Sequence, residues 1–435
     1  MTAGRPVRDL TDPGQNRAVL EFASRLLHEG DPGRRGPGGT TADEEQNPAV
    51  AVEADSAARG RRALAAVDEP VHLSVVWAMY GETGRIQPRA LHPHGEDFLR
   101  EKVRQLDWLT TGLPVTWSIL ACDDGCPDSP SSAELMHRIA RAEGYPEHGH
   151  RSVQVIRLGD RIGGRHPIGP AFDALRSPGQ SRKGGSIVAA LGAVLDEPQA
   201  PDGVRHVPCY TDADLSANLA QLGSLAATVV TRPGVVVACG QRYGTAEAVL
   251  VTPDGPTREP RSTGDKPDKL IILFRHVVRA LLIPQLAHVA DTQAGFKAFD
   301  ETALRGVLPT MTSFAETFDV ELLTRLAQRH GSESLAVSPI VFTEDFAATN
   351  FPSVDPGPTH LAMVRQVVEL HDRLVAPVAP ARDTAAELLE LVRTLELDRY
   401  VRLIEGLRAE DTDDATLFDR RWPVSRLRAL ADAVG

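Results

Sequence analysis

Acidic residues follow apolar runs at three places in the sequence, and their chemistry is the easiest to name. The three pairs are Asp123 and Asp124 after WSILAC, Asp212 and Asp214 after VRHVPCY, and Asp319 and Glu321 within TFDVELL. Carboxylates bind divalent cations, accept hydrogen bonds from hydroxyl and base N–H groups, and take protons as general bases. These acids are therefore the first candidates for a functional site.

The pair Asp212 and Asp214 is the strongest of the three signals. Because alternate side chains of an extended chain point the same way, two acids two residues apart present their oxygens to one cation. Mg²⁺ or Mn²⁺ suits such a site, since each leaves coordination positions for the oxygens of a diphosphate. The alternative is a helix cap, with Asp214 or Thr211 accepting from the first amides of a helix that begins near Leu215. The motif alone leaves both interpretations open.

The segment Asp123-Asp124-Gly125 also has two interpretations. A carboxylate at a strand end can accept hydrogen bonds from the base or ribose of a nucleotide. The alternative is a turn and helix cap, because Pro127, Asp128 and Ser129 are turn residues as well.

Short β-branched runs separated by helical patterns fill residues 71–352. The runs are VHLSVVWAM, PVTWSILAC, SVQVIRL, VRHVPCY, GVVVACG and LAVSPIVF. Strands that alternate with helices predict an α/β domain with a mainly parallel sheet and helices on both faces. Ligands of such sheets bind beyond the carboxyl ends of the strands, which is where the acids lie.

Helical segments are predicted at both ends of the chain. Residues 1–70 indicate a helix at 15–28 and a flexible linker rich in Gly, Pro, Glu and Arg. Residues 353–435 indicate a C-terminal helical region, for which packing on the sheet domain is favoured over pairing with a second subunit. Residues 81–95 are expected to form a mobile loop, in which His92 and His94 are a less favoured second metal site.

Composition and charge bound the function. The chain has 435 residues and a net charge of −12, which argues against a broad nucleic-acid or anionic-membrane footprint. Four cysteines and the absence of an opening signal peptide indicate a cytoplasmic protein with reduced thiols. The stretch 270–290 is apolar but contains Arg275, His276, Arg279 and Pro284, so it is not expected to span a membrane, although it offers an apolar face for peripheral contact with one.

Together these blocks resemble a family-2 glycosyltransferase, and most of all the branch of dolichyl-phosphate β-glucosyltransferases and polyprenyl-phosphate glycosyltransferases. The blocks are Ser74-Val-Val-Trp-Ala-Met-Tyr-Gly-Glu82, Ile119-Leu-Ala-Cys-Asp-Asp-Gly125, Arg182-Lys-Gly-Gly-Ser186, Tyr210-Thr-Asp-Ala-Asp-Leu-Ser216, Gly240-Gln-Arg-Tyr243, Asp291-Thr-Gln-Ala-Gly-Phe-Lys297 and Phe318-Asp-Val-Glu-Leu322. The resemblance implies a GT-A fold, a UDP- or GDP-sugar donor, one Mg²⁺ or Mn²⁺ ion, and inversion at the anomeric carbon.

The resemblance also implies roles for single residues. These are Glu82 and Asp123 or Asp124 in the nucleoside pocket, Lys183 near the nucleotide, Asp212 and Asp214 at the metal and diphosphate, Gln293, Gly295 and Lys297 facing sugar and acceptor, and Asp319 at the place of the family's catalytic Asp.

The chemistry of sugar transfer is consistent with these roles. The leaving diphosphate gains negative charge that cations stabilise, and the acceptor oxygen must lose a proton to a base. Asp319 is the preferred base, and Glu321 is less favoured because a helical start would turn it away. Arg242, Arg275 and Arg279 are candidates to neutralise the diphosphate, although the last two are also explained as a solvated helix face.

The sequence therefore predicts a cation-dependent glycosyltransferase whose acceptor is a polyprenyl phosphate or a small hydroxyl compound. The alternative is a catalytically silent protein that binds sugar nucleotides and docks partners through its terminal helices. Nucleotidyl transfer is disfavoured, since residues 77–84 lack the Gly-rich basic loop that this reaction uses.

Overall fold

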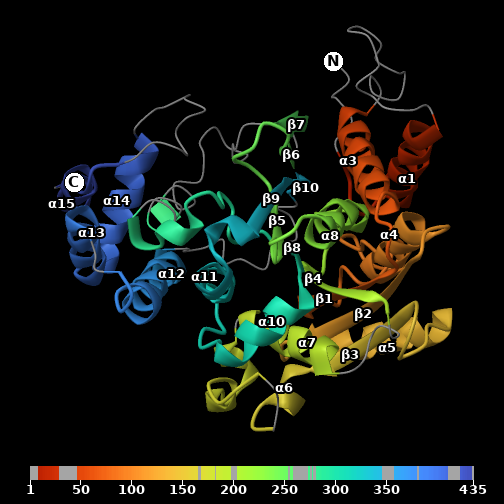
Figure 1. Ribbon diagram of the computed structural model, residues 1–435, viewed down its shortest axis with the longest axis horizontal. Helices are drawn as coiled ribbons and strands as arrows, with labels where there is room; N and C mark the ends of the chain where they lie inside the picture. Colours follow the sequence, from red (N-terminus) through yellow and green to blue (C-terminus); the bar gives the residue numbers. More distant parts are fainter. Residues whose placement is uncertain are drawn as a thin grey trace, which may run out of the picture.

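The computed structural model describes residues 8–28, 47–164, 168–181, 183–196, 203–252, 255–257, 273–274, 277, 281–344, 357–379, 382–409 and 422–433. A seven-stranded sheet of order β3-β2-β1-β4-β8-β5-β9 lies at its centre (Figure 1). β8 runs antiparallel to its two neighbours, and the other pairs are parallel. The strands are β1 (Val71–Met79), β2 (Val115–Asp123), β3 (Ser152–Arg157), β4 (Arg205–Thr211), β5 (Val237–Gln241), β8 (Phe296–Phe299) and β9 (Leu335–Pro339).

Helices cover both faces of this sheet, which confirms the predicted α/β fold class. One apolar core joins the sheet to α7 and α11, and another joins it to α4, α5 and α8. The helices are α1 (Pro13–His28), α3 (Pro48–Ala65), α4 (Phe98–Thr110), α5 (Ser132–Glu143), α6 (Leu158–Arg161), α7 (Gly184–Asp196), α8 (Leu222–Thr231), α10 (Glu301–Val307), α11 (Phe318–His330), α12 (Gly357–Leu370), α13 (Asp383–Arg393), α14 (Leu397–Ala409) and α15 (Val424–Asp432).

All six apolar runs form strands, because a strand buried on both faces needs apolar side chains at nearly every position. The last run divides into β9 and β10 (Val341–Thr343), and β10 belongs to a second sheet. That sheet has the order β10-β6-β7, with β6 at Val249–Thr252 and β7 at Gly255–Thr257.

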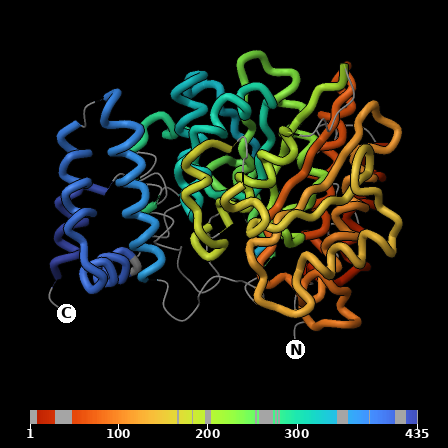
Figure 2. Tube along the Cα trace, turned by 90° about the horizontal axis from the view of Figure 1, so that it is seen from below, coloured from red at the N-terminus to blue at the C-terminus, as the bar shows by residue number. Residues whose placement is uncertain are grey.

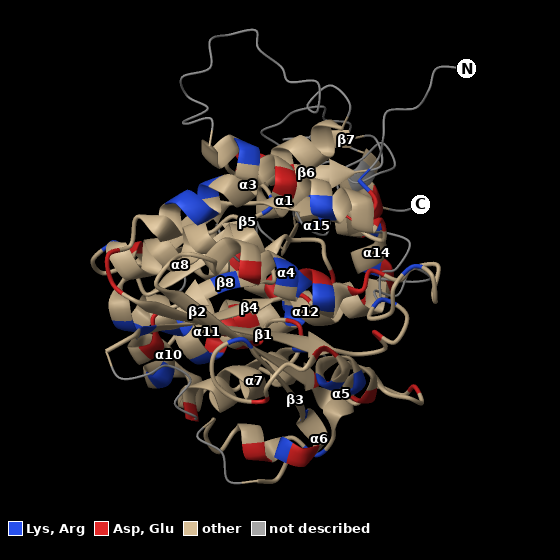
Figure 3. Ribbon diagram, turned by 90° about the vertical axis from the view of Figure 1, so that its right-hand side faces the viewer, with Lys and Arg blue, Asp and Glu red and all other residues tan. Residues whose placement is uncertain are grey.

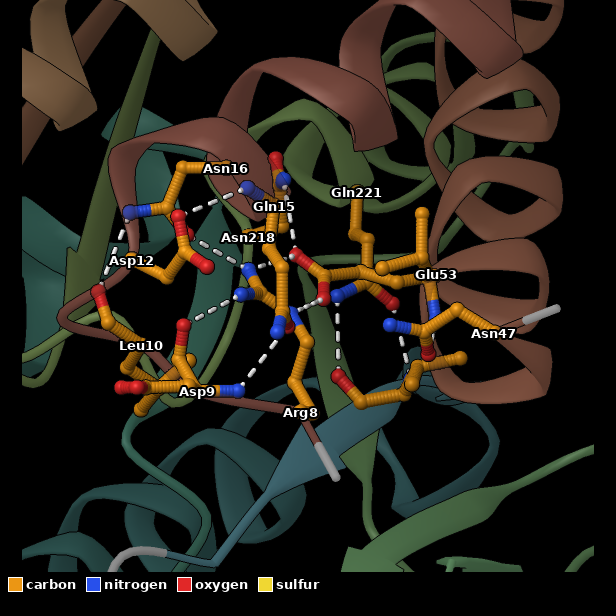
Figure 4. A network of polar contacts seen from close by, with 12 residues as sticks. Arg8, Asp9, Leu10, Asp12, Gln15, Asn16, Asn47, Glu53, Asn218 and Gln221 are labelled. Atoms are coloured by element: carbon orange, nitrogen blue, oxygen red, sulfur yellow. Dashed lines mark hydrogen bonds and ion pairs between the residues drawn. The ribbon is translucent and has the colours of Figure 1, made fainter. Parts of the chain in front are cut away.

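The predicted flexible linker is wrong for residues 48–65, which form the helix α3. Small residues on α3 allow it to pack closely on the sheet domain: a Cβ at Gly60 would lie 2.2 Å from the Ala220 carbonyl oxygen. A buried polar network joins α1, α3 and the segment after β4 (Figure 4). In it Glu53 accepts hydrogen bonds from Arg8 Nε at 2.7 Å and Asn218 Nδ2 at 3.0 Å. The N-terminal helices are thus fixed to the sheet domain.

The C-terminal helices lie on the opposite side of the molecule from α1 and α3 (Figures 1 and 2). Their apolar core is continuous with that of α7 and α11. Polar contacts also cross the boundary, because Thr317 Oγ1 donates to Gln366 Oε1 at 3.0 Å and Gln328 Nε2 donates to the Leu374 carbonyl at 2.6 Å. The C-terminal helices thus pack on the sheet domain, which is the arrangement that the sequence analysis favoured. The domain boundaries at residues 70 and 352 remain predictions.

The stretch 270–290 contributes to the interior. Most of its described apolar residues are buried in the core around α7 and α11, among them Val277, Leu282, Ile283 and Leu286. Among the described residues, no helix combines the length and apolarity that crossing a membrane requires. Figure 3 shows acidic and basic residues interspersed over the helices on one side of the molecule.

Two buried histidines lie within the sheet, on β1 and β4. His72 contacts Thr116 Oγ1 through Nδ1 at 2.8 Å and Ser118 Oγ through Nε2 at 3.0 Å, and its ring lies 5.9 Å from that of His206. Burial, together with the positive charges that His206 and His150 would carry, lowers the pKa of His72 from 6.5 to about 3. The folded protein therefore holds His72 neutral throughout the mildly acidic range.

We expect His72 to make the protein less stable in acid. Between pH 6.5 and about pH 3 the unfolded chain binds a proton at His72 that the folded chain does not, so stability falls as pH falls. From pH 7 to pH 5 this loss is on the order of 2 kcal/mol of unfolding free energy. Urea unfolding at both pH values should show a smaller loss in His72→Asn, whereas exposed His94→Asn should behave like wild type. An unchanged loss in His72→Asn would contradict this.

Candidate active site

Five of the predicted acids lie at the edge formed by the carboxyl ends of β1, β2 and β4, namely Glu82, Asp123, Asp124, Asp212 and Asp214. Lys183, in the turn before α7, connects two of them: its backbone N donates to Asp124 Oδ2 at 2.7 Å, and its Nζ forms an ion pair with Asp212. Arg85, in the loop after β1, connects two more, with Nη1 2.9 Å from Asp214 Oδ2 and Nε 3.6 Å from Glu82 Oε2. Two side-chain cations thus hold the acids together.

Asp212 lies against a glycine and a lysine. A Cβ at Gly295 would lie 2.4 Å from Asp212 Oδ1, so only glycine leaves room for the carboxylate in this position. Burial tends to raise the pKa of Asp212, but the Lys183 ammonium and the Arg242 guanidinium outweigh it and lower that pKa below 3.8. The carboxylate is partly exposed, so a ligand can reach it.

Asp214 does not cap a helix at Leu215. The segment after β4 continues as bends, and the first helical turn begins at Leu219, where the Asn218 side chain accepts from Ala220 N. Asp214 Oδ1 accepts only a short-range bond from Ser216 N at 3.1 Å, while Oδ2 binds Arg85. This geometry favours the cation-binding interpretation over the cap.

Glu82 lies beside the Asp212 and Asp214 pair. Its backbone N donates to Ser132 Oγ at 2.9 Å, which fixes the loop after β1 to the start of α5. Burial raises the pKa of Glu82 to about 7, with the negative charges of Asp214 and Asp212 adding to the rise and Arg85 and Lys183 opposing it.

The carboxylates of Asp123 and Asp124 are engaged by the protein itself. Asp123 Oδ1 accepts from Gly125 N and Cys126 N, and its Oδ2 accepts from Ala133 N. This is the turn and helix-cap interpretation of the motif. Asp124 Oδ1 accepts from Ser186 Oγ at 2.7 Å, so the second aspartate holds the start of α7. A direct contact of either carboxylate with a nucleoside remains a prediction.

Asp319 lies in the first turn of α11. Its side chain is buried, and Oδ1 accepts from Val320 N at 2.8 Å. Burial raises the pKa of Asp319 to about 6, although the positive charges of Lys297 and Lys183 act in the opposite direction. A carboxyl with this pKa is ionised at neutral pH and binds a proton more readily than an exposed aspartate does.

Lys297 lies beneath the site rather than at its surface. Its Nζ donates to Tyr210 Oη at 2.8 Å and to the Ala294 carbonyl at 2.5 Å, and the side chain is fully buried. The contact with sugar and acceptor that the resemblance implies therefore stays a prediction for this residue. Gln293 is partly buried, and its Nε2 donates to the Glu316 carbonyl at 3.2 Å.

Glu321 is buried on the far side of the first turn of α11, where it organises the preceding loop. Its carboxylate accepts from Thr312 N and Oγ1 and from Ser313 N, and it pairs with Arg325 at 2.7 Å. These contacts favour Asp319 over Glu321 as a base.

Arg242 is held by a buried acid. Its Nε and Nη2 donate to the two oxygens of Asp291 at 2.7 and 3.0 Å, and its positive charge helps to lower the pKa of Asp212. Arg275 and Arg279, the other cations considered for the diphosphate, lie outside the described residues.

The residues at this edge fit a divalent cation that would be held jointly by the protein and by the oxygens of a bound diphosphate. Within the described ranges, no three His, Cys, Asp or Glu side chains converge in a metal-binding arrangement, and this includes His92 and His94. The protein would therefore supply Asp212 and Asp214, with the remaining positions left to diphosphate and water, as Mg²⁺ sites commonly do. Each aspartate already pairs with a positive charge, and Gly295 provides the space in which Asp212 lies.

Sequence reasoning missed Arg85, Glu96 and Lys102. Arg85 belongs to the predicted mobile loop and Glu96 directly follows it; Glu96 Oε2 accepts from Leu215 N at 2.8 Å. Lys102 is fully buried on α4, its Nζ has no hydrogen-bond partner among the residues that the structure describes, and it lies 5.5 Å from the centre of the Trp77 ring. Lys102 could have been noticed in the sequence, because it occupies a position on the otherwise apolar face of α4.

Comparisons with known proteins found similarity only among solved structures; no family model and no curated protein sequence matches the chain. One similar structure is glucosyl-3-phosphoglycerate synthase from Mycobacterium tuberculosis with Mn²⁺, UDP-glucose and phosphoglyceric acid, at TM-score 0.42 and 17% identity over 78% of this chain and 84% of that chain. Others are the synthase with Mn²⁺, UDP-glucose and glycerol 3-phosphate, at TM-score 0.43 and 16% identity over 78% and 86%, and with Mg²⁺ and UDP, at TM-score 0.41 and 18% identity over 73% and 83%. None of these three is a dolichyl-phosphate glucosyltransferase, so the assignment to that branch stays a prediction.

Proposed function

We propose that the protein is an inverting glycosyltransferase that uses a nucleotide diphosphate sugar and a divalent cation. The observation that best supports this proposal is that Lys183 interacts with both the Asp-x-Asp segment and the buried Asp319. Lys183 pairs with Asp212 of the Asp-x-Asp segment and also acts electrostatically on Asp319, the buried carboxyl with a raised pKa. Transfer of a sugar needs both a place for a diphosphate and a base for the acceptor.

The chain's own residues account for the proton and the charge in this reaction. Asp319 would accept the proton of the attacking hydroxyl, and burial makes it a stronger base than an ordinary aspartate while leaving it ionised at neutral pH. Lys183 and Arg242 would stabilise the charge that develops on the leaving diphosphate. Asp212 and Asp214 would hold Mg²⁺ or Mn²⁺, which when bound offsets the charge of the diphosphate.

Glu321 has a positioning role in this proposal. It ties Thr312 and Ser313 to α11, and it lies two residues after Asp319, on the far side of the same helical turn. The loop before α11 is further held by Gln366 on α12, whose Oε1 accepts from Thr317 Oγ1. The C-terminal helices therefore help to fix the position of the base.

A small hydroxyl compound is the acceptor we favour. Most of the apolar side chains described between residues 270 and 290, among them Val277, Leu282 and Ile283, are buried in the core, so these side chains do not offer a surface to a lipid-linked acceptor. The four cysteines all fall within the described residues and none forms a disulfide, which is consistent with the predicted cytoplasmic location.

The alternative of a silent binding protein is less well supported, because such a protein has no use for a buried base. The two functions are separated by a screen of UDP-, GDP- and dTDP-sugars with and without Mn²⁺, read out by thermal shift. A donor at 100 times its dissociation constant stabilises the folded state by about 2.7 kcal/mol.

Donors that bind are then incubated with a panel of hydroxyl acceptors that includes phosphoglycerate, and products are detected by mass spectrometry. The proposal expects a glycosylated product or released nucleoside diphosphate that disappears with EDTA. Binding of a donor without either product would favour the silent alternative, and failure of every donor to bind would contradict both.

A further inference from the structure

The loop after β1 places a guanidinium directly on one of the two aspartates. Arg85 Nη1 lies 2.9 Å from Asp214 Oδ2, and the arginine side chain is only 11% exposed. Its Nε lies 3.6 Å from Glu82 Oε2 and 3.9 Å from Glu96 Oε1. Arg85 is thus surrounded by carboxylates, and the shortest of these contacts is with Asp214.

The loop that carries Arg85 is held in place on both sides. Glu96 N donates to the Arg85 carbonyl at 3.0 Å, and Ile86 N donates to the Glu82 carbonyl at 3.0 Å. Glu96 also binds the backbone of Leu215, next to Asp214. The backbone of Arg85 is therefore fixed relative to Asp214, and any exchange of its ion-pair partner has to come from the side chain.

Asp214 Oδ2 cannot bind the Arg85 guanidinium and coordinate a divalent cation with the same lone pairs. Two positive groups at one carboxylate also repel each other. A guanidinium that leaves a carboxylate finds an equivalent partner in a diphosphate, since both accept its paired N–H donors.

We propose that Arg85 is an exchangeable counter-ion: it competes with the divalent cation for Asp214, and when displaced it binds the diphosphate of the donor. This inference rests on the proposed function and adds a residue to it. It assigns one side chain two successive anionic partners, first Asp214 and then the diphosphate.

Arg85→Gln tests this proposal in the full chain, by two binding measurements that do not depend on turnover. Affinity for Mn²⁺ alone, measured by electron paramagnetic resonance, should increase about tenfold because a competing charge is removed. Affinity for UDP or GDP in saturating Mn²⁺, whichever nucleotide binds wild type more tightly, should decrease about fivefold or more. A merely structural role of Arg85 would weaken both affinities, so opposite shifts are the diagnostic result.

Arg89→Gln is the matched control, because Arg89 lies in the same loop and forms an exposed ion pair with Asp9 at 2.7 Å. It should change neither affinity. Arg85→Lys keeps the positive charge and should bind Mn²⁺ within about threefold of wild type, so it tests the proposal even if Arg85→Gln fails to fold.

The proposal is overturned if Arg85→Gln binds Mn²⁺ no more tightly than wild type, if its nucleotide affinity is unchanged, or if Arg85→Lys shows the tenfold gain. The proposed function is judged separately, by wild type and Asp214→Asn. If wild type binds Mn²⁺ and nucleotide and Asp214→Asn loses Mn²⁺, the metal assignment stands whatever Arg85 does. If wild type binds neither, both proposals fall.

Discussion

Replacing Asp319 with Asn is expected to lower kcat by about 10²- to 10⁴-fold, the range that a positioned general base contributes. Asn has the same shape, and its side-chain oxygen still accepts from Val320 N, so α11 should begin as in wild type. What the variant loses is the ability to take a proton from the acceptor. Donor binding should therefore be unchanged, and the loss should appear in kcat at saturating donor.

The pH dependence of wild type provides a second measurement of the same residue. Because the pKa of Asp319 is raised to about 6, turnover should fall about tenfold per pH unit below pH 6 and level off above it. Asp319→Asn should lack this acid limb. Asp173→Asn, at an exposed position to which no role in the site is assigned, is the control and should retain both rate and pH profile. Half of the wild-type rate in Asp319→Asn would contradict the assignment.

The same variant should be more stable than wild type at neutral pH. The folded-state pKa of Asp319 is raised above its unfolded value of 3.8, so the folded state favours the protonated form, and stability is lost as pH rises through about 6. Removing the ionised carboxylate should restore on the order of 1 to 3 kcal/mol above pH 6 and nothing below pH 4. A loss of rate together with a gain in stability distinguishes a catalytic group from a structural one.

Much of the sheet could be predicted because buried parallel strands have a simple pattern. β1 and β2 are buried along almost their whole length and are mainly apolar. Such continuous runs differ from the pattern of an amphipathic helix, in which polar residues separate the apolar ones. β8 was missed because it has only four residues and follows Gly295, and because its place between β4 and β5 depends on long-range pairing. Local pattern cannot supply such a partner.

The N-terminal helix α3 could not be recognised from its local sequence pattern. α3 is rich in Ala and Arg, and it has few of the large apolar residues by which an amphipathic helix is recognised. Its stability comes from contacts that the sequence does not reveal, such as the close approach at Gly60 and the bonds of Glu53 to Arg8 and Asn218. Composition alone therefore predicted a flexible linker where tertiary packing makes a helix.

At the site, residue types were predictable but their partners were not. The Asp-x-Asp spacing identified Asp212 and Asp214, since it repeats the period of an extended chain. Arg85 reaches Asp214 from a loop 129 residues earlier in the sequence, and nothing in that loop's composition distinguishes it from Arg89. Electrostatic partners of this kind follow from topology and appear only once the strands are placed side by side.

Asp212→Asn is expected to reduce cation-dependent turnover by about 10²- to 10³-fold, because a neutral amide binds Mg²⁺ or Mn²⁺ far more weakly than a carboxylate. The variant should still fold, since Asn keeps the volume of Asp, and thermal unfolding checks this. Raising Mn²⁺ should recover part of the rate if the loss lies in metal affinity. Turnover that stays at the wild-type level would show that Asp212 does not hold the cation.

Gly295→Ala separates the effect of the position of the Asp212 carboxylate on Mn²⁺ binding from the effect of its charge. The added methyl group would lie 2.4 Å from Asp212 Oδ1, so the carboxylate must move while its charge remains. Displacing a ligand in this way should weaken Mn²⁺ binding by about 10- to 100-fold, less than the loss in Asp212→Asn. Gly159→Ala is the matched control, because a methyl group there would meet only Pro178 Cγ at 3.8 Å. Equal Mn²⁺ affinities for Gly295→Ala and Gly159→Ala would mean that the carboxylate can shift without loss, and that Asp212 acts through its charge rather than its position.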